Sequence, residues 1–201
     1  MKFSKKRISA LLESSKIALN VAMNDEEIKN ALLKYNFDEA RLNEGLELYN
    51  NASQLAADQK KEYGEQYSAR EEFEKVFEEG NAIFIEHSKF SKLAYRNNAN
   101  KLAKLGIVGN RPTTITGWLD QAKSFYKNAL SDEELISKLS RYAITKEKLE
   151  AGQQLIINVE EAKVRHNIEM GEAQQSQNDV MKQSKIWIFI YLNYSLLLNT
   201  L

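Results

Sequence analysis

Two histidines are the first candidates for chemistry in this sequence, and their neighbours decide what chemistry they could do. A di-iron site in a helical bundle uses Glu-x-x-His on two helices together with further carboxylates. Phe84 stands three residues before His87, and Lys163 stands three residues before His166. The HExxH pattern of zinc peptidases is absent as well. We therefore predict no metal site, and we expect both histidines at the surface or at the edge of a bundle.

Glycines and paired glutamates are the other residues that could do chemistry. Gly106 and Gly109 lie in a stretch that has no strand before it and no Gly-Lys-Ser/Thr after it, so we predict a helix end and a linker rather than a phosphate loop. Adjacent glutamates at 71–72 and 78–79 belong to a highly charged helical stretch, which is typical of a solvated face. We predict no catalytic residue, no cofactor and no enzyme activity.

The stretch 86–111 is basic and could bind anions. It contains six basic residues, Lys89, Lys92, Arg96, Lys101, Lys104 and Arg111, and a single acidic one, Glu86. Two aromatic residues, Phe90 and Tyr95, stand among them. One hypothesis is phosphate or nucleic-acid binding at this elbow. The alternative is an ordinary basic helix end, which the helix dipole favours.

The segment 186–201 is strongly apolar and follows Lys182 and Lys185. One hypothesis is a membrane anchor, although the segment is shorter than the span of about 20 residues that a bilayer requires. The alternatives are a helix end buried in a bundle, and a truncation or a change of reading frame near this end. A membrane is therefore a possible partner only through 186–201.

Composition limits the remaining function classes. The 201 residues carry 28 basic and 28 acidic side chains, so no net charge favours nucleic acid or an acidic membrane. The chain contains no cysteine, which fits a reducing compartment. Glu13 and Lys16 interrupt the apolar stretch that a signal peptide would need after the basic N-terminus. We therefore predict a cytoplasmic protein. Proline occurs only once, so we also expect long helices.

The two halves of the sequence repeat one pattern at a constant offset of 107 residues. The aligned pairs include Leu32 and Leu139, Tyr35 and Tyr142, Gly45 and Gly152, and Gly64 and Gly171. Two matched glycines inside helical stretches are difficult to attribute to shared composition. A fixed period indicates repeated architecture. We predict an internally duplicated all-α fold with repeats at 1–107 and 108–201, intertwined in one structural unit.

Each repeat is predicted to contain three helices. Apolar residues recur at helical spacing in both halves. We predict helices at 3–22, 24–35, 38–95, 114–130, 132–142 and 145–198, and no strands. Asn24 and Ser131 are N-cap residue types, and Glu27 and Glu134 follow them at capping-box spacing. Asn24 and Ser131 are therefore the predicted caps of the second helix of each repeat.

The third helix of each repeat is long enough to form a coiled-coil arm. About 57 residues at 1.5 Å per residue would span about 85 Å. The short linker 96–112 favours an antiparallel pair of long helices in an elongated bundle, because a parallel pair would need a long return. We predict that Gly64 and Gly171 face each other where the helices cross closely. The alternative is a helix break at each glycine, which would produce a compact bundle.

The run Leu105-Gly106-Ile107-Val108-Gly109-Asn110-Arg111-Pro112, with Trp118, Phe125 and Tyr126 after it, resembles a family of uncharacterised bacterial helical-bundle proteins. The run Tyr63-Gly64-Glu65-Gln66 is similar to one in the same family. The resemblance implies the helical fold and no activity. We therefore expect a non-enzymatic scaffold or interaction module that binds a protein partner or a second copy of itself.

Overall fold

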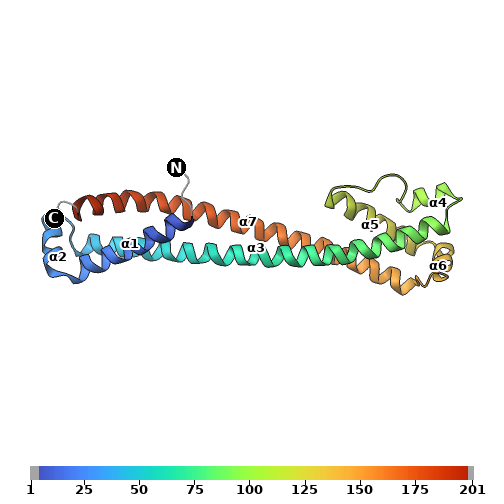
Figure 1. Ribbon diagram of the computed structural model, residues 1–201, viewed down its shortest axis with the longest axis horizontal. Coiled ribbons are helices and arrows are strands. Elements are labelled where there is room, and N and C mark those ends of the chain that lie inside the picture. The colour runs from blue at the N-terminus through green and yellow to red at the C-terminus, as the bar shows by residue number, and fades with distance from the viewer. Residues whose placement is uncertain (1–4, 199–201) are drawn as a thin grey trace. The chain divides into compact units, whose positions relative to one another are not determined.

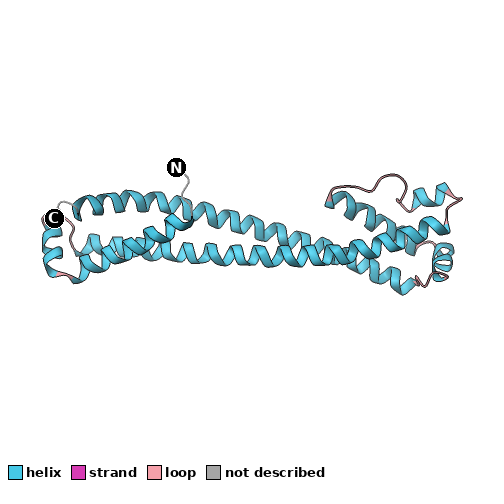
Figure 2. Cartoon of the chain, viewed as in Figure 1, coloured by secondary structure: helices cyan, strands magenta, loops and turns pink. Residues whose placement is uncertain are grey.

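The computed structural model describes the backbone of residues 5–198 and the side chains of residues 8–183. The described residues form helices joined by short loops, with no strand among them (Figures 1 and 2). The helices are α1 (Lys5–Asn24), α2 (Glu26–Leu33), α3 (Glu39–Ala94), α4 (Ala99–Lys104), α5 (Ile115–Leu130), α6 (Glu133–Ser140) and α7 (Lys146–Leu198). The prediction of an all-α fold is confirmed.

The chain divides into two compact units. Unit 1 contains Met1–Gln66 and Glu169–Leu201, and unit 2 contains Tyr67–Ile168. The long helices α3 and α7 each contribute one stretch to both units. The units therefore do not follow the predicted repeat boundary between 1–107 and 108–201, because each long helix packs against the long helix of the other half as well as against helices of its own half.

Within each unit, α3 and α7 pack against each other in opposite directions. In unit 2, the ring of Phe73 stacks on His166 with centroids 5.9 Å apart, and Gly80, further along α3, lies against Val159, earlier in α7. In unit 1, the hydroxyl of Tyr63 donates a hydrogen bond of 3.0 Å to Gln177. Increasing residue numbers on α3 thus meet decreasing numbers on α7, as in an antiparallel pair.

An aromatic cluster forms the core of unit 2. The ring of Phe84 lies 6.0 Å from Trp118 and 5.5 Å from Phe125, both in edge-on geometry. Tyr126 is fully buried beside them, and its ring lies directly over Gly152 of α7. A side chain at Gly152 would place its Cβ 2.6 Å from the Tyr126 ring, so glycine permits this close packing of α5 on α7.

The N-caps of α2 and α6 are Asp25 and Asp132, so the prediction of Asn24 and Ser131 was wrong by one residue. Asp25 Oδ1 accepts hydrogen bonds from the backbone N–H groups of Glu27 and Ile28. Asp132 Oδ1 accepts one of 3.0 Å from Leu135. Asn24 is instead the last residue of α1, and Ser131 ends α5. A short carboxylate satisfies the free N–H groups and also suits the positive helix end.

The turns that follow α2 and α6 have the same geometry. Asn36 and Ala143 have φ values of 62° and 59°, and the N–H groups of the next residues, Phe37 and Ile144, each bond back to a leucine carbonyl at 3.2 Å. This bond closes a Schellman-type helix end in which one residue must be left-handed. The local structure around α2 therefore recurs 107 residues later.

The predicted close crossing at Gly64 and Gly171 was wrong, and α3 and α7 continue unbroken through both residues. A Cβ built on either glycine would meet no atom within 4 Å beyond its own helical backbone. The register explains the difference. Because Tyr63 contacts Gln177, the α7 residue level with Gly64 lies several positions beyond Gly171.

The linker 96–112 contains a short helix, α4, that was not predicted. Asn98 caps it by accepting a hydrogen bond of 3.1 Å from the Lys101 N–H. Gly106, with φ of 69°, ends it, as predicted for a helix C-terminus rather than a phosphate loop. Thr114 caps α5, so that helix begins at Ile115, one residue later than expected.

Candidate functional site

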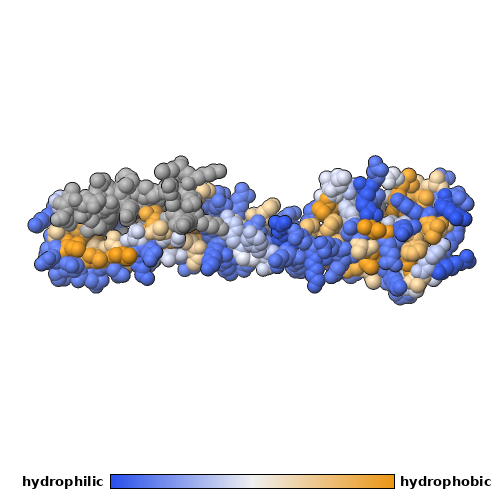
Figure 3. All heavy atoms as spheres, viewed as in Figure 1, coloured by the Kyte–Doolittle hydropathy of each residue, from blue (hydrophilic) through white to orange (hydrophobic). Residues whose placement is uncertain are grey.

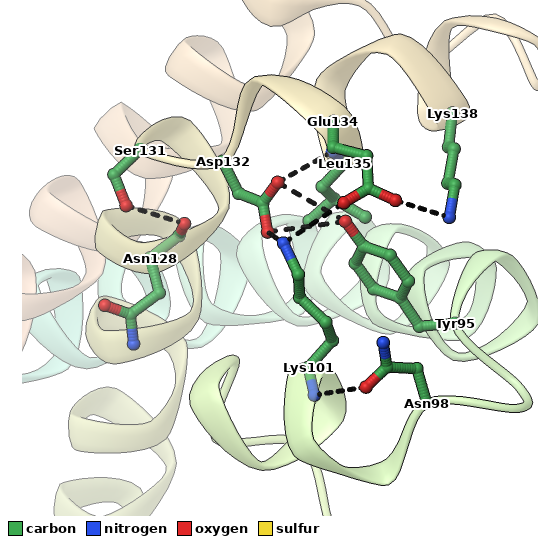
Figure 4. A network of polar contacts seen from close by, with 9 residues as sticks. All are labelled: Tyr95, Asn98, Lys101, Asn128, Ser131, Asp132, Glu134, Leu135 and Lys138. Atoms are coloured by element: carbon green, nitrogen blue, oxygen red, sulfur yellow. Dashed lines mark hydrogen bonds and ion pairs between the residues drawn. The ribbon is translucent and has the colours of Figure 1, made fainter.

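A polar network joins the residue that follows α3, helix α4 and the N-terminus of α6 within unit 2 (Figure 4). The Tyr95 hydroxyl donates to both carboxylate oxygens of Asp132 at 3.3 Å, and Lys101 Nζ lies 2.7 Å from Asp132 Oδ2. Lys101 also reaches Glu134 at 3.3 Å, and Lys138 pairs with Glu134 at 2.9 Å. Both ammonium groups lie over the Tyr95 ring, Lys138 at 4.5 Å and Lys101 at 5.4 Å from its centroid.

The electrostatics of this network keep each group in its ordinary charge state. Burial alone would raise the pKa of Asp132, but the hydrogen bonds from Lys101 and from the Leu135 N–H outweigh it, and the net pKa is lowered. The hydrogen bond to Asp132 raises the pKa of Lys101. Burial and the Asp132 charge raise the pKa of Tyr95. A neutral Tyr95, an ionised Asp132 and a charged Lys101 hold the helices together and do not favour proton transfer.

The network changes the interpretation of the basic stretch 86–111. Lys101 is compensated by two carboxylates and is not available for a phosphate. Lys92 and Arg111, in contrast, line the same open pocket in unit 2. Within the basic stretch the structure therefore distinguishes Lys101, which is paired, from Lys92 and Arg111, which line a pocket.

His87 is buried, so its prediction as a surface or edge residue was wrong. Its side chain is 3% exposed, and His87 Nδ1 lies 3.1 Å from the hydroxyl oxygen of Tyr126. Burial lowers the pKa of His87, as does the charge of Lys148, while Glu86 opposes them. Burial raises the pKa of Tyr126. The two side chains satisfy each other's hydrogen-bonding groups inside an apolar core. Nothing in the sequence spacing indicates Tyr126 as the partner of His87.

Three glutamates of unit 1 lie close together. One carboxylate oxygen from each of Glu62, Glu65 and Glu169 lies within 4.8 Å of the others. The Oε2 atoms of Glu62 and Glu169 are buried without a hydrogen-bond partner, whereas Glu65 pairs with Lys61 at 3.3 Å. Carboxylates are ligands that hard divalent cations prefer, so this cluster could hold one. Glu62 and Glu169 are aligned at the repeat offset, the one sequence signal that could have found them.

An apolar stripe, formed by Ile157, Val164 and Ile168, lies on α7 within unit 2. These side chains are 38%, 52% and 52% exposed, respectively. Their spacing of seven and four residues places them together on one helix face, opposite the buried residue Val159. On the face of unit 2 that Figure 3 shows, apolar residues likewise occur among hydrophilic ones around α4, α5 and α6.

The hypothesis of a membrane anchor falls on residues 186–201, whose side chains lie outside the described residues. Among the residues that the structure describes, no helix has the length and apolarity to cross a membrane.

Comparison with known proteins adds no relative. No protein-family model matches this chain, and neither does any curated protein or any solved structure. The resemblance to bacterial helical-bundle proteins therefore stays a prediction.

Proposed function

We propose that this chain is a non-enzymatic, cytoplasmic helical-bundle protein that acts as an interaction scaffold by pairing with a second copy of itself. The observation that supports the proposal is the apolar stripe on α7. Spacings of seven and four residues are those of a helix–helix seam. Because two identical stripes are complementary, an antiparallel pairing brings Ile157 of one copy near Ile168 of the other, around a two-fold axis.

The expected association is weak. Burying a half-exposed aliphatic side chain contributes about 1 kcal/mol. The loss of translational and rotational freedom costs at least about 4 kcal/mol. Burial of the six side chains of two stripes therefore contributes only slightly more free energy than association costs. We expect a dimer that forms with increasing protein concentration.

Sedimentation equilibrium over a range of protein concentrations tests this function. Val164→Lys places a charge in the centre of the stripe and is expected to shift the chain to monomer. Val108→Lys is the matched control, because Val108 is 60% exposed and lies on the loop after α4 rather than on α7. A wild-type chain that remains monomeric at every concentration, or equal effects of the two substitutions, would overturn the proposal.

We also propose that the two repeats arose by duplication of an ancestral three-helix segment in a bacterial protein. The recurrence of local structure supports this origin. The caps Asp25 and Asp132, and the left-handed residues Asn36 and Ala143, are separated by the same 107 residues. The absence of cysteine supports the cytoplasmic location.

A further inference from the structure

A pocket of about 200 Å³ in unit 2 has the features of an anion site. Lys92 of α3 and Arg111 of the loop after α4 line it, together with Gln121 of α5. Ser88 and the buried ring of Phe84 form part of its wall. Three separate segments of the chain thus bring a lysine, an arginine and an amide to one cavity.

The charge in this pocket is not compensated from within the protein. No carboxylate lines the cavity. In the part of the chain that the structure describes, neither Lys92 nor Arg111 takes part in an ion pair. The nearby lysines Lys101 and Lys138, in contrast, are held by Asp132 and Glu134. Two positively charged residues without an ion-pair partner therefore line one small pocket.

Local contacts hold the pocket in shape without occupying its donors. The Gln121 amide nitrogen donates a hydrogen bond of 2.9 Å to the Gly106 carbonyl, which fixes the side chain and leaves its second N–H available. The Arg111 guanidinium lies 5.6 Å above the centroid of Phe84. An arginine that rests on an aromatic ring keeps its planar set of N–H donors free for an oxyanion.

We propose that this pocket binds the phosphate group of a small phosphomonoester. A phosphomonoester carries between one and a half and two negative charges near neutral pH, about as many as the two cations supply. A carboxylate or a phosphodiester carries one. Pockets for drug-sized ligands usually measure about 300–1,000 Å³, so a cavity of this size suits a small ligand. The site is independent of the proposed pairing, because the stripe on α7 shares no residue with it.

Titration of the full chain with glycerol 3-phosphate, followed by NMR of the Gln121 side-chain amide and by calorimetry at low salt, tests the site. Inorganic phosphate, acetate and a short single-stranded DNA serve as comparison probes. We expect both phosphates to bind and to shift the Gln121 amide signals. Acetate or DNA that binds at least as tightly as glycerol 3-phosphate would overturn the assignment to a phosphomonoester, as would the absence of any binding.

Variants then assign the binding to the two cations. Lys92→Gln and Arg111→Gln are each expected to weaken glycerol 3-phosphate binding at least tenfold. Lys89→Gln is the matched control, because Lys89 is an exposed lysine on the same helix that does not line the pocket. All three residues are exposed, and circular dichroism verifies that the variants fold. Equal weakening by Lys89→Gln would show a diffuse basic field and overturn the site.

Discussion

At the residue scale, His87 couples the stability of the aromatic core to pH. In an unfolded chain, histidine takes up a proton near its ordinary pKa of about 6.5. Burial and Lys148 lower the pKa of His87 in the folded chain. Between these two pKa values the unfolded state binds more protons, so the stability is fully present above about pH 6.5 and decreases as the pH falls below it.

We therefore predict that the urea midpoint of the wild-type chain falls more steeply between pH 7 and pH 5 than that of His87→Gln. Glutamine removes the titration but can still bond with the Tyr126 hydroxyl, 3.1 Å from the histidine ring in the wild type. Every other titratable group is the same in the two proteins, so the difference between the two curves belongs to His87. Parallel curves would contradict the burial of a neutral imidazole.

Also at the residue scale, Glu62 and Glu169 are expected to repel each other. Each has a buried carboxylate oxygen without a hydrogen-bond partner, and the two carboxylates lie close together. We predict that Glu62→Gln raises the free energy of unfolding by about 1 kcal/mol, since it removes a like-charge contact and supplies an N–H donor to Glu169. Urea denaturation in the presence of EDTA measures the effect. Glu74→Gln, which breaks an exposed pair with Arg70 outside the cluster, is the control and should change stability little. A loss of stability in Glu62→Gln would contradict simple repulsion.

At the scale of helices, the glycines of the long helices differ in what surrounds them. A Cβ on Gly64 or Gly171 would meet open space, whereas one on Gly152 would lie 2.6 Å from the Tyr126 ring. We predict that Gly64→Ala and Gly171→Ala each raise the free energy of unfolding by up to about 1 kcal/mol through helix propensity. Gly152→Ala should lower it by about 1–3 kcal/mol through overpacking. Urea denaturation of the three variants measures these changes. A loss of stability in Gly64→Ala would contradict the open surroundings of Gly64 and would support a close helix crossing there.

The same scale shows what could be predicted from the sequence. Apart from the unpredicted α4 and the predicted start at residue 3, which lies outside the described residues, helix ends were predicted to within about two residues, because caps, glycines and apolar periodicity are local signals. The register of α3 against α7 could not be predicted, since it depends on which side chains interlock across the pair. For the same reason the burial of His87, the partners of Asp132 and the cavity between Lys92 and Arg111 were not found. Each of these features depends on residues from different helices, and the sequence alone does not determine how those helices are placed relative to one another.

At the scale of the whole molecule, the compact units and the predicted repeats are different divisions of the chain. Unit 2 is one continuous segment, Tyr67–Ile168, and contains stretches of α3 and α7 that pack on each other. A fragment of residues 1–107 would contain all of α3 without any of α7, and a fragment of residues 108–201 would contain the reverse. Each repeat fragment thus exposes the apolar seam that the other covers.

We therefore predict that a fragment of residues 67–168 folds by itself, whereas fragments 1–107 and 108–201 do not. The aromatic cluster of Phe84, Trp118 and Phe125, with its cover from α7, lies entirely within 67–168. This fragment should unfold cooperatively in urea and retain a near-ultraviolet circular dichroism signal from its packed rings. The repeat fragments should aggregate or lose helicity gradually, because each lacks core residues that the other half supplies, such as Phe84 for the fragment 108–201. Cooperative unfolding of either repeat fragment, with fixed aromatic packing, would show that each repeat folds independently and that the units defined by contact are not the folding units.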